Sequence, residues 1–186
     1  MDAQAVKARL QAQEGTVPYM YKCTGGKVTI GVGHALESAD LACKLNWAVA
    51  GAPANAQQVQ DDFGKVAAAA RGAKASTYEP LTSCRLAPAD IDALLDSDIQ
   101  QFEAQLRQKI QKWDGLPPTV QEALFDMGFN LGIGGLLEFK RLLAAVAAAD
   151  WTTAAAESHR MGISDERNQE TANLFLQAGS APATAT

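Results

Sequence analysis

The sequence contains few of the residues that would mark several common classes of protein. Its three cysteines, Cys23, Cys43 and Cys84, are too few for a disulfide framework, and none of them forms a CxxC pair typical of zinc sites. Lys and Arg number 16 against 21 for Asp and Glu, which gives a formal net charge of -5. A basic surface for nucleic acid is therefore not expected, and we predict no nucleic-acid partner, metal or cofactor.

Long hydrophobic runs are also missing. No stretch approaches the roughly 20 apolar residues of a membrane-spanning helix, so we predict no membrane insertion. Residues 1–13 are polar and helical in pattern and lack the apolar core of a signal peptide. We therefore expect synthesis in the cytoplasm. If the substrate lies outside the membrane, something else must carry or release the protein.

The residues that are present predict a globular chain with an α/β part at its beginning. Hydrophobic residues make up 47% of the sequence, enough for one domain. Apolar and aromatic residues alternate on both sides of Thr24-Gly25-Gly26, a pattern that predicts a β-hairpin. Gly31 and Gly33 inside the following strand indicate a bend, or a close approach of the backbone to a ligand.

The rest of the chain predicts helices, so the fold class is α+β and mostly helical. A helix is expected over 57–70, and apolar residues with helical spacing predict a long one from Pro88 to Ile110. Thr119 is expected to cap a helix ending at Phe129. Further helices are predicted over 136–149, 151–160 and 165–178. We expect one domain over 1–186, with an α/β lobe over 1–86 that includes an insertion at about 43–85, a connecting helix over 87–110, a helical lobe over 111–179 and a flexible tail over 180–186.

Three residues around the predicted hairpin have the chemistry needed to cleave a glycosidic bond. Such cleavage requires an acid to protonate the leaving oxygen and a second group to activate water or attack the sugar. Glu14 stands just before the hairpin, followed after eight residues by Cys23 and after five more by Thr29. A glutamate in this position is usually an ordinary surface residue, so the assignment depends on the whole pattern.

The pattern Glu14-Gly15, Tyr21-Lys22, Thr24, Gly26 and Thr29 to His34 closely resembles the N-terminal motif of the T-even phage lysozymes, glycoside hydrolase family 24. Residues 123–132 resemble the helix that lines the cleft in that family, whereas 43–85 do not match its shortest members. The resemblance implies a lysozyme-like fold of two lobes. It also implies a muramidase that cleaves the β-1,4 bond between N-acetylmuramic acid and N-acetylglucosamine in bacterial peptidoglycan.

The resemblance assigns roles to particular residues. Glu14 is implied to be the general acid, and Thr29 to help position the attacking water. His34 matches a histidine that pairs with an acid on the long helix, which is Asp98 here. The residues implied to bind substrate are Gly33, Asn130, which matches an amide-bearing residue of the cleft, and Arg167, which matches a basic residue that forms a salt bridge with the catalytic glutamate.

Position 23 departs from the commonest family pattern, which has Asp there and less often Cys. A cysteine can replace a carboxylate only as a thiolate, and its reference pKa of about 8.5 keeps it mostly neutral at pH 7 unless its surroundings lower that value. It can alternatively act as a nucleophile. The choice between inverting and retaining chemistry therefore stays open.

Two other functions fit part of the same pattern. A lytic transglycosylase cleaves the same bond with one glutamate, which would make Cys23 incidental. A peptidoglycan-binding module on a lysozyme fold would need no catalytic residue at position 23.

A muramidase would act on the cell wall in the periplasm, as a monomer, after release as a phage endolysin or secretion as an antibacterial effector. An effector would require an immunity protein that plugs the cleft in the producing cell.

Overall fold

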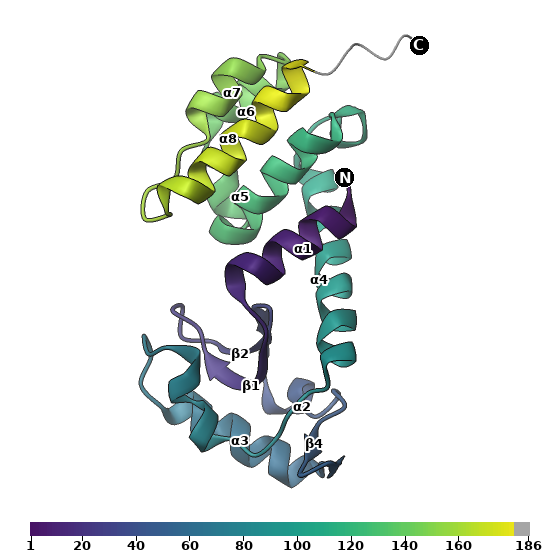
Figure 1. The fold of residues 1–186 in the computed structure, drawn as a ribbon, viewed down its shortest axis with the longest axis vertical. Helices are drawn as coiled ribbons and strands as arrows, with labels where there is room; N and C mark the ends of the chain where they lie inside the picture. Colours follow the sequence, from purple (N-terminus) through teal and green to yellow (C-terminus); the bar gives the residue numbers. More distant parts are fainter. Residues whose placement is uncertain (181–186) are drawn as a thin grey trace. The chain divides into compact units, whose positions relative to one another are not determined.

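The computed structural model describes residues 1–180 and is 62% helical, with a small antiparallel sheet (Figure 1). The predicted α+β, mostly helical fold class is therefore confirmed. Contacts divide the chain into two compact units, one formed by residues 7–99 and the other by residues 1–6 together with the chain from residue 100 onward. The predicted flexible tail lies outside the described residues except for Ser180, which ends a helix.

The unit of residues 7–99 contains the predicted hairpin. Its sheet has the order β1 (Val17–Lys22), β2 (Val28–Gly31) and β3 (His34–Ala35), and all neighbours are antiparallel. Helix α3 (Ala56–Ala68) packs against β1 and β2. The smaller elements of this unit are α2 (Ala39–Ala42), the two-stranded sheet of β4 (Ala48–Val49) and β5 (Ala52–Pro53), and the short 3-10 helices η1 (Ala75–Thr77) and η2 (Glu79–Leu81).

Glycine is needed where β2 ends. Gly31 and Gly33 both have positive φ, at 67° and 86°, which turns the chain from β2 into β3 as the sequence predicts. A Cβ on Gly31 would also lie only 3.0 Å from Cγ2 of Ile91, on the long helix. The close approach at Gly31 is thus to a core side chain rather than to a ligand.

Helix α3 is joined to the chain that follows it by a buried carboxylate. Asp62 is only 1% exposed, and its Oδ2 accepts hydrogen bonds from the backbone N–H groups of Ser83 (2.7 Å) and Cys84 (2.8 Å). Burial alone would raise the pKa of Asp62, but these donors hold it below its usual value.

Cys84 is fully buried, and burial raises the pKa of its thiol to about 12. Cys23, Cys43 and Cys84 are all free thiols.

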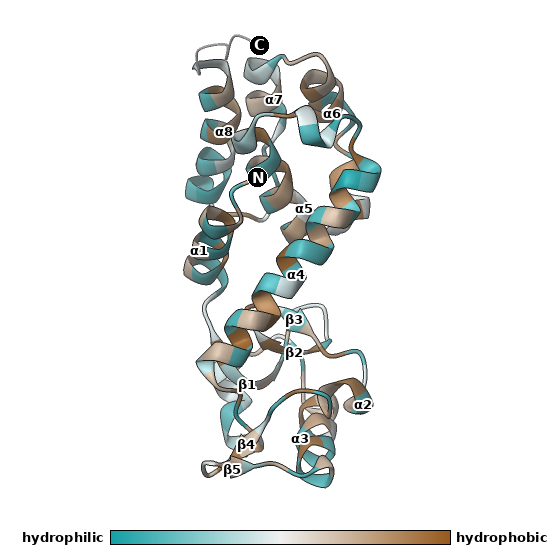
Figure 2. Cartoon of the chain, turned by 90° about the vertical axis from the view of Figure 1, so that its right-hand side faces the viewer, coloured by the Kyte–Doolittle hydropathy of each residue, from teal (hydrophilic) through white to brown (hydrophobic). Residues whose placement is uncertain are grey.

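The predicted long helix is α4 (Pro88–Lys109), which begins at the expected proline and contributes residues to both units. Hydrophilic and hydrophobic residues alternate along it (Figure 2). Ile91, Leu95 and Ile99 are each 2% exposed, and Leu106 is fully buried. Its apolar side is therefore in the core along most of its length, as helical spacing predicts.

The remaining helices confirm the helical prediction, with corrections to their ends. They are α5 (Pro118–Leu137), α6 (Lys140–Ala147), α7 (Trp151–Glu157) and α8 (Asp165–Ser180), with the 3-10 helix η3 (Trp113–Gly115) before them. Thr119 is not the cap of α5, because the helix begins at Pro118 with Pro117 in the N-cap position. The helix also continues past Phe129 through a kink at Gly132 (φ 74°, ψ 160°), so the predicted helix over 136–149 begins only at Lys140.

Two kinds of feature were not found among the described residues. No helix within residues 1–180 is both long and apolar enough to cross a membrane. In the same part of the chain, no group of three or more His, Cys, Asp and Glu side chains is arranged to hold a metal ion.

Candidate active site

Glu14 is the last residue of helix α1 (Ala3–Glu14), and its side chain is exposed. Gly15 follows with a φ of +71°, and its N–H donates to the carbonyl of Gln11 at 3.1 Å. A glycine with positive φ after the last helical turn is a common way to end a helix, because the left-handed conformation costs it little. The chain therefore leaves α1 sharply at Glu14 and enters β1 three residues later, at Val17.

Helix α1 is fixed to α4 by a buried lysine. Lys7 is 7% exposed, and its Nζ lies 2.7 Å from Oδ2 of Asp92 and 2.8 Å from Oδ1 of Asp96. Gln11 adds a hydrogen bond from Nε2 to Oδ1 of Asp92 at 3.2 Å. Lys7, Gln11 and Glu14 follow one another at helical spacing, so the face of α1 that carries Glu14 is held in a fixed orientation on α4.

Cys23 begins the turn of the β1–β2 hairpin, and its sulfur is surrounded by hydrogen-bond donors. The turn closes with a bond from Cys23 N to Lys27 O at 3.0 Å and one from Gly26 N to Cys23 O at 2.9 Å. Burial alone would raise the pKa of the Cys23 thiol. The N–H of Lys27, the hydroxyl of Thr29 and the N–H groups of Gly25 and Gly26 outweigh it and lower that pKa below the ordinary value. The hairpin therefore favours the thiolate.

Thr29 is on β2, next to this turn, and is only 2% exposed. Its hydroxyl donates to the carbonyl of Lys27 at 3.0 Å and also lies within hydrogen-bonding range of the Cys23 sulfur. A hydroxyl has one proton, so donation to a thiolate would replace donation to the carbonyl. Thr29 thus lies near enough to lower the pKa of the thiol, and the structure brings the second and third residues of the predicted pattern together.

Tyr21 is a site residue that our reading of the sequence missed. Burial, together with the negative charges of Cys23 and Glu14, raises the pKa of its phenol to about 12, although a hydrogen bond from the backbone N–H of Gly33 opposes this rise. The phenol is therefore close to both predicted catalytic groups and to Gly33. Its place in the motif beside Lys22 was the only signal in the sequence, because a tyrosine in a strand is usually a packing residue.

His34 and Asp98 form the expected pair. Nδ1 of the histidine lies 2.9 Å from both carboxylate oxygens of Asp98, and the two side chains are 28% and 22% exposed. The hydrogen bond to Asp98 raises the pKa of His34, and the partial burial of the ring only reduces this effect. The pair joins β3 to α4 at the residue that follows Gly33 in the chain.

Asn130 and Arg167 belong to the other unit. Asn130 is exposed on α5, two residues before the kink at Gly132. Arg167 donates from Nε and Nη2 to Oδ1 of Asp126, at 3.2 and 2.9 Å. The other oxygen of Asp126 accepts from Nη2 of Arg160 at 2.8 Å and from the hydroxyl of Thr171 at 3.1 Å. This buried network was not predicted, because nothing local in the sequence marks Asp126.

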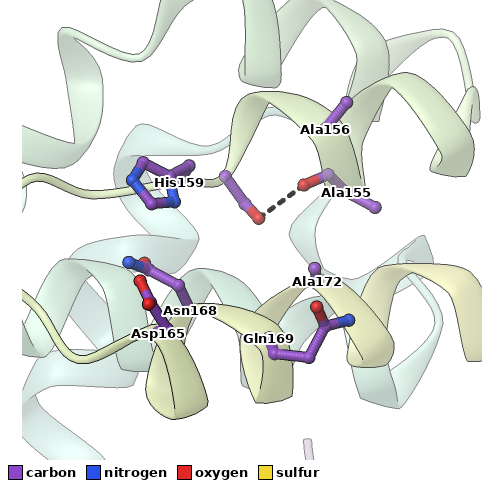
Figure 3. A pocket seen from close by; sticks show the side chains of 8 residues that line it. Ala155, Ala156, His159, Asp165, Asn168, Gln169 and Ala172 are labelled. Atoms are coloured by element: carbon purple, nitrogen blue, oxygen red, sulfur yellow. Dashed lines mark hydrogen bonds between the residues drawn. The ribbon is translucent and has the colours of Figure 1, made fainter.

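A hollow of about 360 Å³ between α7 and α8 is lined by none of the predicted site residues (Figure 3). Two of its polar residues hold the intervening loop. Ser158 donates to the carbonyl of Ala155 at 2.8 Å, and Asn168 exchanges hydrogen bonds with the backbone N–H and C=O of Arg160, both at 3.0 Å. We therefore assign these contacts a structural role.

The model of the family described as phage lysozyme matches residues 55–172. Asp98, Asn130 and Arg167 are inside the match, whereas Glu14, Cys23 and Thr29 precede it. No curated protein gives a significant match to the chain. Since the family match covers more than half of the sequence, the chain belongs to the phage lysozyme family, which supports a muramidase-type peptidoglycan hydrolase in general.

Proposed function

We propose that this protein is a muramidase that hydrolyses the β-1,4 bond between N-acetylmuramic acid and N-acetylglucosamine. The observation that carries the proposal is the surroundings of Tyr21, whose phenol is influenced by both Glu14 and Cys23. A carboxyl group and a thiol with a lowered pKa thus both act electrostatically on one side chain. An acid and a second, anionic group are what hydrolysis of a glycosidic bond requires.

In the proposed reaction, Glu14 donates its proton to the oxygen that leaves with the cleaved sugar. Its place at the end of a helix anchored by Lys7 keeps the carboxyl oriented while leaving it exposed to substrate. Positive charge develops on the sugar as the bond breaks, and the Cys23 thiolate supplies the opposing negative charge. The thiolate then either holds the attacking water or attacks the sugar carbon itself; in the second case, water that gives its proton to Glu14 displaces the sulfur and releases the sugar.

Thr29 acts in this proposal through Cys23. Thr29 is almost fully buried, so its proposed role is indirect. Its hydroxyl stabilises the thiolate, and the thiolate positions the water. Asn130 and Arg167 are proposed to bind the glycan, with Arg167 oriented by Asp126. The expected partner is a peptidoglycan strand, which the protein meets as a monomer in the periplasm.

The main test is Glu14→Gln, which keeps the shape of the side chain but cannot donate a proton to the leaving oxygen. We expect the release of reducing ends from purified peptidoglycan to fall by about a hundredfold to ten-thousandfold. The variant should still unfold cooperatively on heating, and Glu138→Gln, at an exposed position, should keep full activity. A folded Glu14→Gln protein with normal activity would refute the proposal, and 1,6-anhydro products from the wild type would identify a transglycosylase instead.

Cys23 is tested by two substitutions with opposite expectations. Cys23→Ser should lose most of the activity, because a hydroxyl is far less acidic than a thiol and would remain neutral at pH 7. Cys23→Asp restores an anion and should keep or raise the activity. Initial rates on purified peptidoglycan measure both. A serine variant with undiminished turnover would mean that Cys23 only packs and that the chemistry does not need it.

The site of action can be tested in living bacteria. We propose that the protein damages the wall only from the periplasmic side, as an endolysin or a secreted effector. Expression behind an export signal should lyse cells, whereas expression of the same chain without that signal should not. Glu14→Gln should abolish lysis in the exported form. Lysis that survives this substitution would show that toxicity arises from something other than hydrolysis.

A further inference from the structure

The hairpin and the segment after α3 carry an excess of positive charge in an acidic protein. Residues 15–36 contain Lys22 and Lys27 and no acidic residue, and residues 63–78 contain three basic residues and again no acidic one. The whole chain has a formal net charge of -5. Since α3 packs on β1 and β2, the two basic segments belong to one surface region.

This region is a fixed structure rather than two loops that happen to be basic. Nζ of Lys22 on β1 donates to the carbonyls of Ala67 and Ala69 at 2.7 and 2.5 Å, which caps the end of α3. The hydroxyl of Tyr78, a residue only 1% exposed, donates to the carbonyl of Ala70 at 2.6 Å. Two side chains therefore hold the backbone just before residue 71: Lys22 from the hairpin, which precedes this segment in the chain, and Tyr78, which follows it.

Arg71 lies beside the hairpin turn that contains Cys23. A Cβ on Gly26 would be 3.9 Å from Cδ of Arg71, and a Cβ on Gly25 would be 3.6 Å from the sulfur of Cys23. The Gly25–Gly26 turn thus lies near the thiol at one residue and near the arginine side chain at the next. This places a guanidinium-bearing side chain next to a proposed catalytic group.

The charges of this region differ in whether they are neutralised. Lys27 pairs with Glu37 at 2.7 Å and Lys65 with Asp62 at 3.2 Å. Arg71 and Lys74 are exposed, and neither has a hydrogen bond or ion pair with any of residues 1–180. Two cations beside the hairpin therefore remain available to a ligand.

We propose that Arg71, with Lys74 as a second cation, binds a carboxylate of the peptide stem that muramic acid residues carry. This inference rests on the proposed muramidase function and names the part of the substrate that the hairpin recognises. The sugars of the glycan are neutral when the lactyl group is linked to peptide, so the carboxylates nearest the cleaved bond are those of the peptide. A planar guanidinium matches a carboxylate with two parallel hydrogen bonds, whereas an ammonium group does so as a point charge.

The consequence is a preference for glycan that carries peptide stems. A strand whose carboxylates have been converted to amides keeps its sugars and its length but loses the partner of Arg71. The wild-type protein should therefore bind amidated peptidoglycan more weakly than native peptidoglycan. Removal of the guanidinium should reduce this difference, and Lys74 should account for what remains.

Binding is measured without cleavage, in the Glu14→Gln background, by co-sedimentation with insoluble peptidoglycan freed of phosphate-bearing polymers. Arg71→Gln should weaken binding to native material about fivefold, as expected for an exposed ion pair near the upper end of its range. It should not change binding to material amidated at its carboxyl groups. Arg71→Lys should have an intermediate effect. Lys44→Gln, which removes an exposed charge of the same unit outside this region, should match the parent on both substrates.

The outcomes separate the two proposals. If Arg71→Gln binds native peptidoglycan as tightly as its parent, or weakens binding to both materials equally, recognition of carboxylate by Arg71 is wrong. If the wild type releases no reducing ends from peptidoglycan, the proposed muramidase function is wrong, whatever the binding results. Thermal unfolding of each variant should equal that of its parent, because the Arg71 side chain is exposed.

Discussion

The two units hold their charged side chains in different ways. In the unit of residues 7–99, Lys7 and His34 join outer elements to α4, and the acids that receive them are partly exposed, at 49% for Asp92, 48% for Asp96 and 22% for Asp98. In the other unit, Asp126 is 4% exposed and its partner Arg160 is fully buried. The ion pairs that Lys7 and His34 make with α4 thus lie at the edge of a core, whereas the network around Asp126 lies inside one.

The difference determines what happens when one partner is lost. An acid at the edge of a core becomes hydrated when its lysine is removed, so only the hydrogen bonds of the pair are lost. An arginine inside a core has no access to water and is left as an uncompensated charge. We therefore expect similar substitutions to have unequal effects on the free energy of unfolding in the two units.

The largest effect is expected for Asp126→Asn. The side chain keeps its shape but loses the charge that Arg160 and Arg167 share, and the cost should be about 3–5 kcal/mol in the free energy of unfolding. Urea denaturation measures this loss. Asp114→Asn is the matched control, because Asp114 pairs with Arg107 at the surface and is 72% exposed. Its cost should be below about 1 kcal/mol.

An intermediate effect is expected for Lys7→Met, which retains the length and apolar stem of the lysine. It removes short hydrogen bonds to two carboxylates that can regain water, so we expect a loss of about 1–2 kcal/mol by urea denaturation. Lys27→Met breaks a pair in which both side chains are about 60% exposed, and it should cost much less than Lys7→Met. A loss at Lys7 equal to that of Asp126→Asn would remove the distinction between edge and interior.

The smallest effect is expected from the pH dependence of the pair between His34 and Asp98. Because the folded-state pKa of His34 is raised, its stabilisation is complete below the unfolded value of about 6.5 and is lost as the pH rises through the higher folded value. The amplitude should be about 1 kcal/mol or less for a partly exposed pair. Urea midpoints measured across neutral pH should show this decline in the wild type. Asp98→Asn should flatten it, and an unchanged slope would contradict the assignment.

The sequence predicted the elements whose signals are local. The hairpin follows from alternation around Thr24-Gly25-Gly26, and α4 follows from helical spacing after Pro88. Both depend on residues close in the chain, where period and turn chemistry are decisive. The proposed site around Cys23 is local for the same reason, because the hairpin itself brings Thr29 to the thiol.

The features that were missed depend on distant partners or on one exceptional backbone angle. Lys7 looks like an ordinary surface lysine, and its carboxylates lie 85 residues or more further along the chain. Asp62 would be assigned to the polar side of α3, yet residues 83 and 84 bury it. The helix ending predicted at Phe129 failed because the chain turns at Gly132 and then resumes a helix, which no periodicity could indicate.

The buried thiol of Cys84 can serve as a chemical probe of local opening around it. A thiol with no exposed surface and a pKa of about 12 reacts with alkylating reagents only while its surroundings are open. In a protein with Cys23 and Cys43 replaced, its alkylation rate would equal the opening equilibrium multiplied by the intrinsic rate of an unfolded cysteine. That rate would report the fraction of molecules in which the segment held by Asp62 is separated from α3, including openings far smaller than global unfolding.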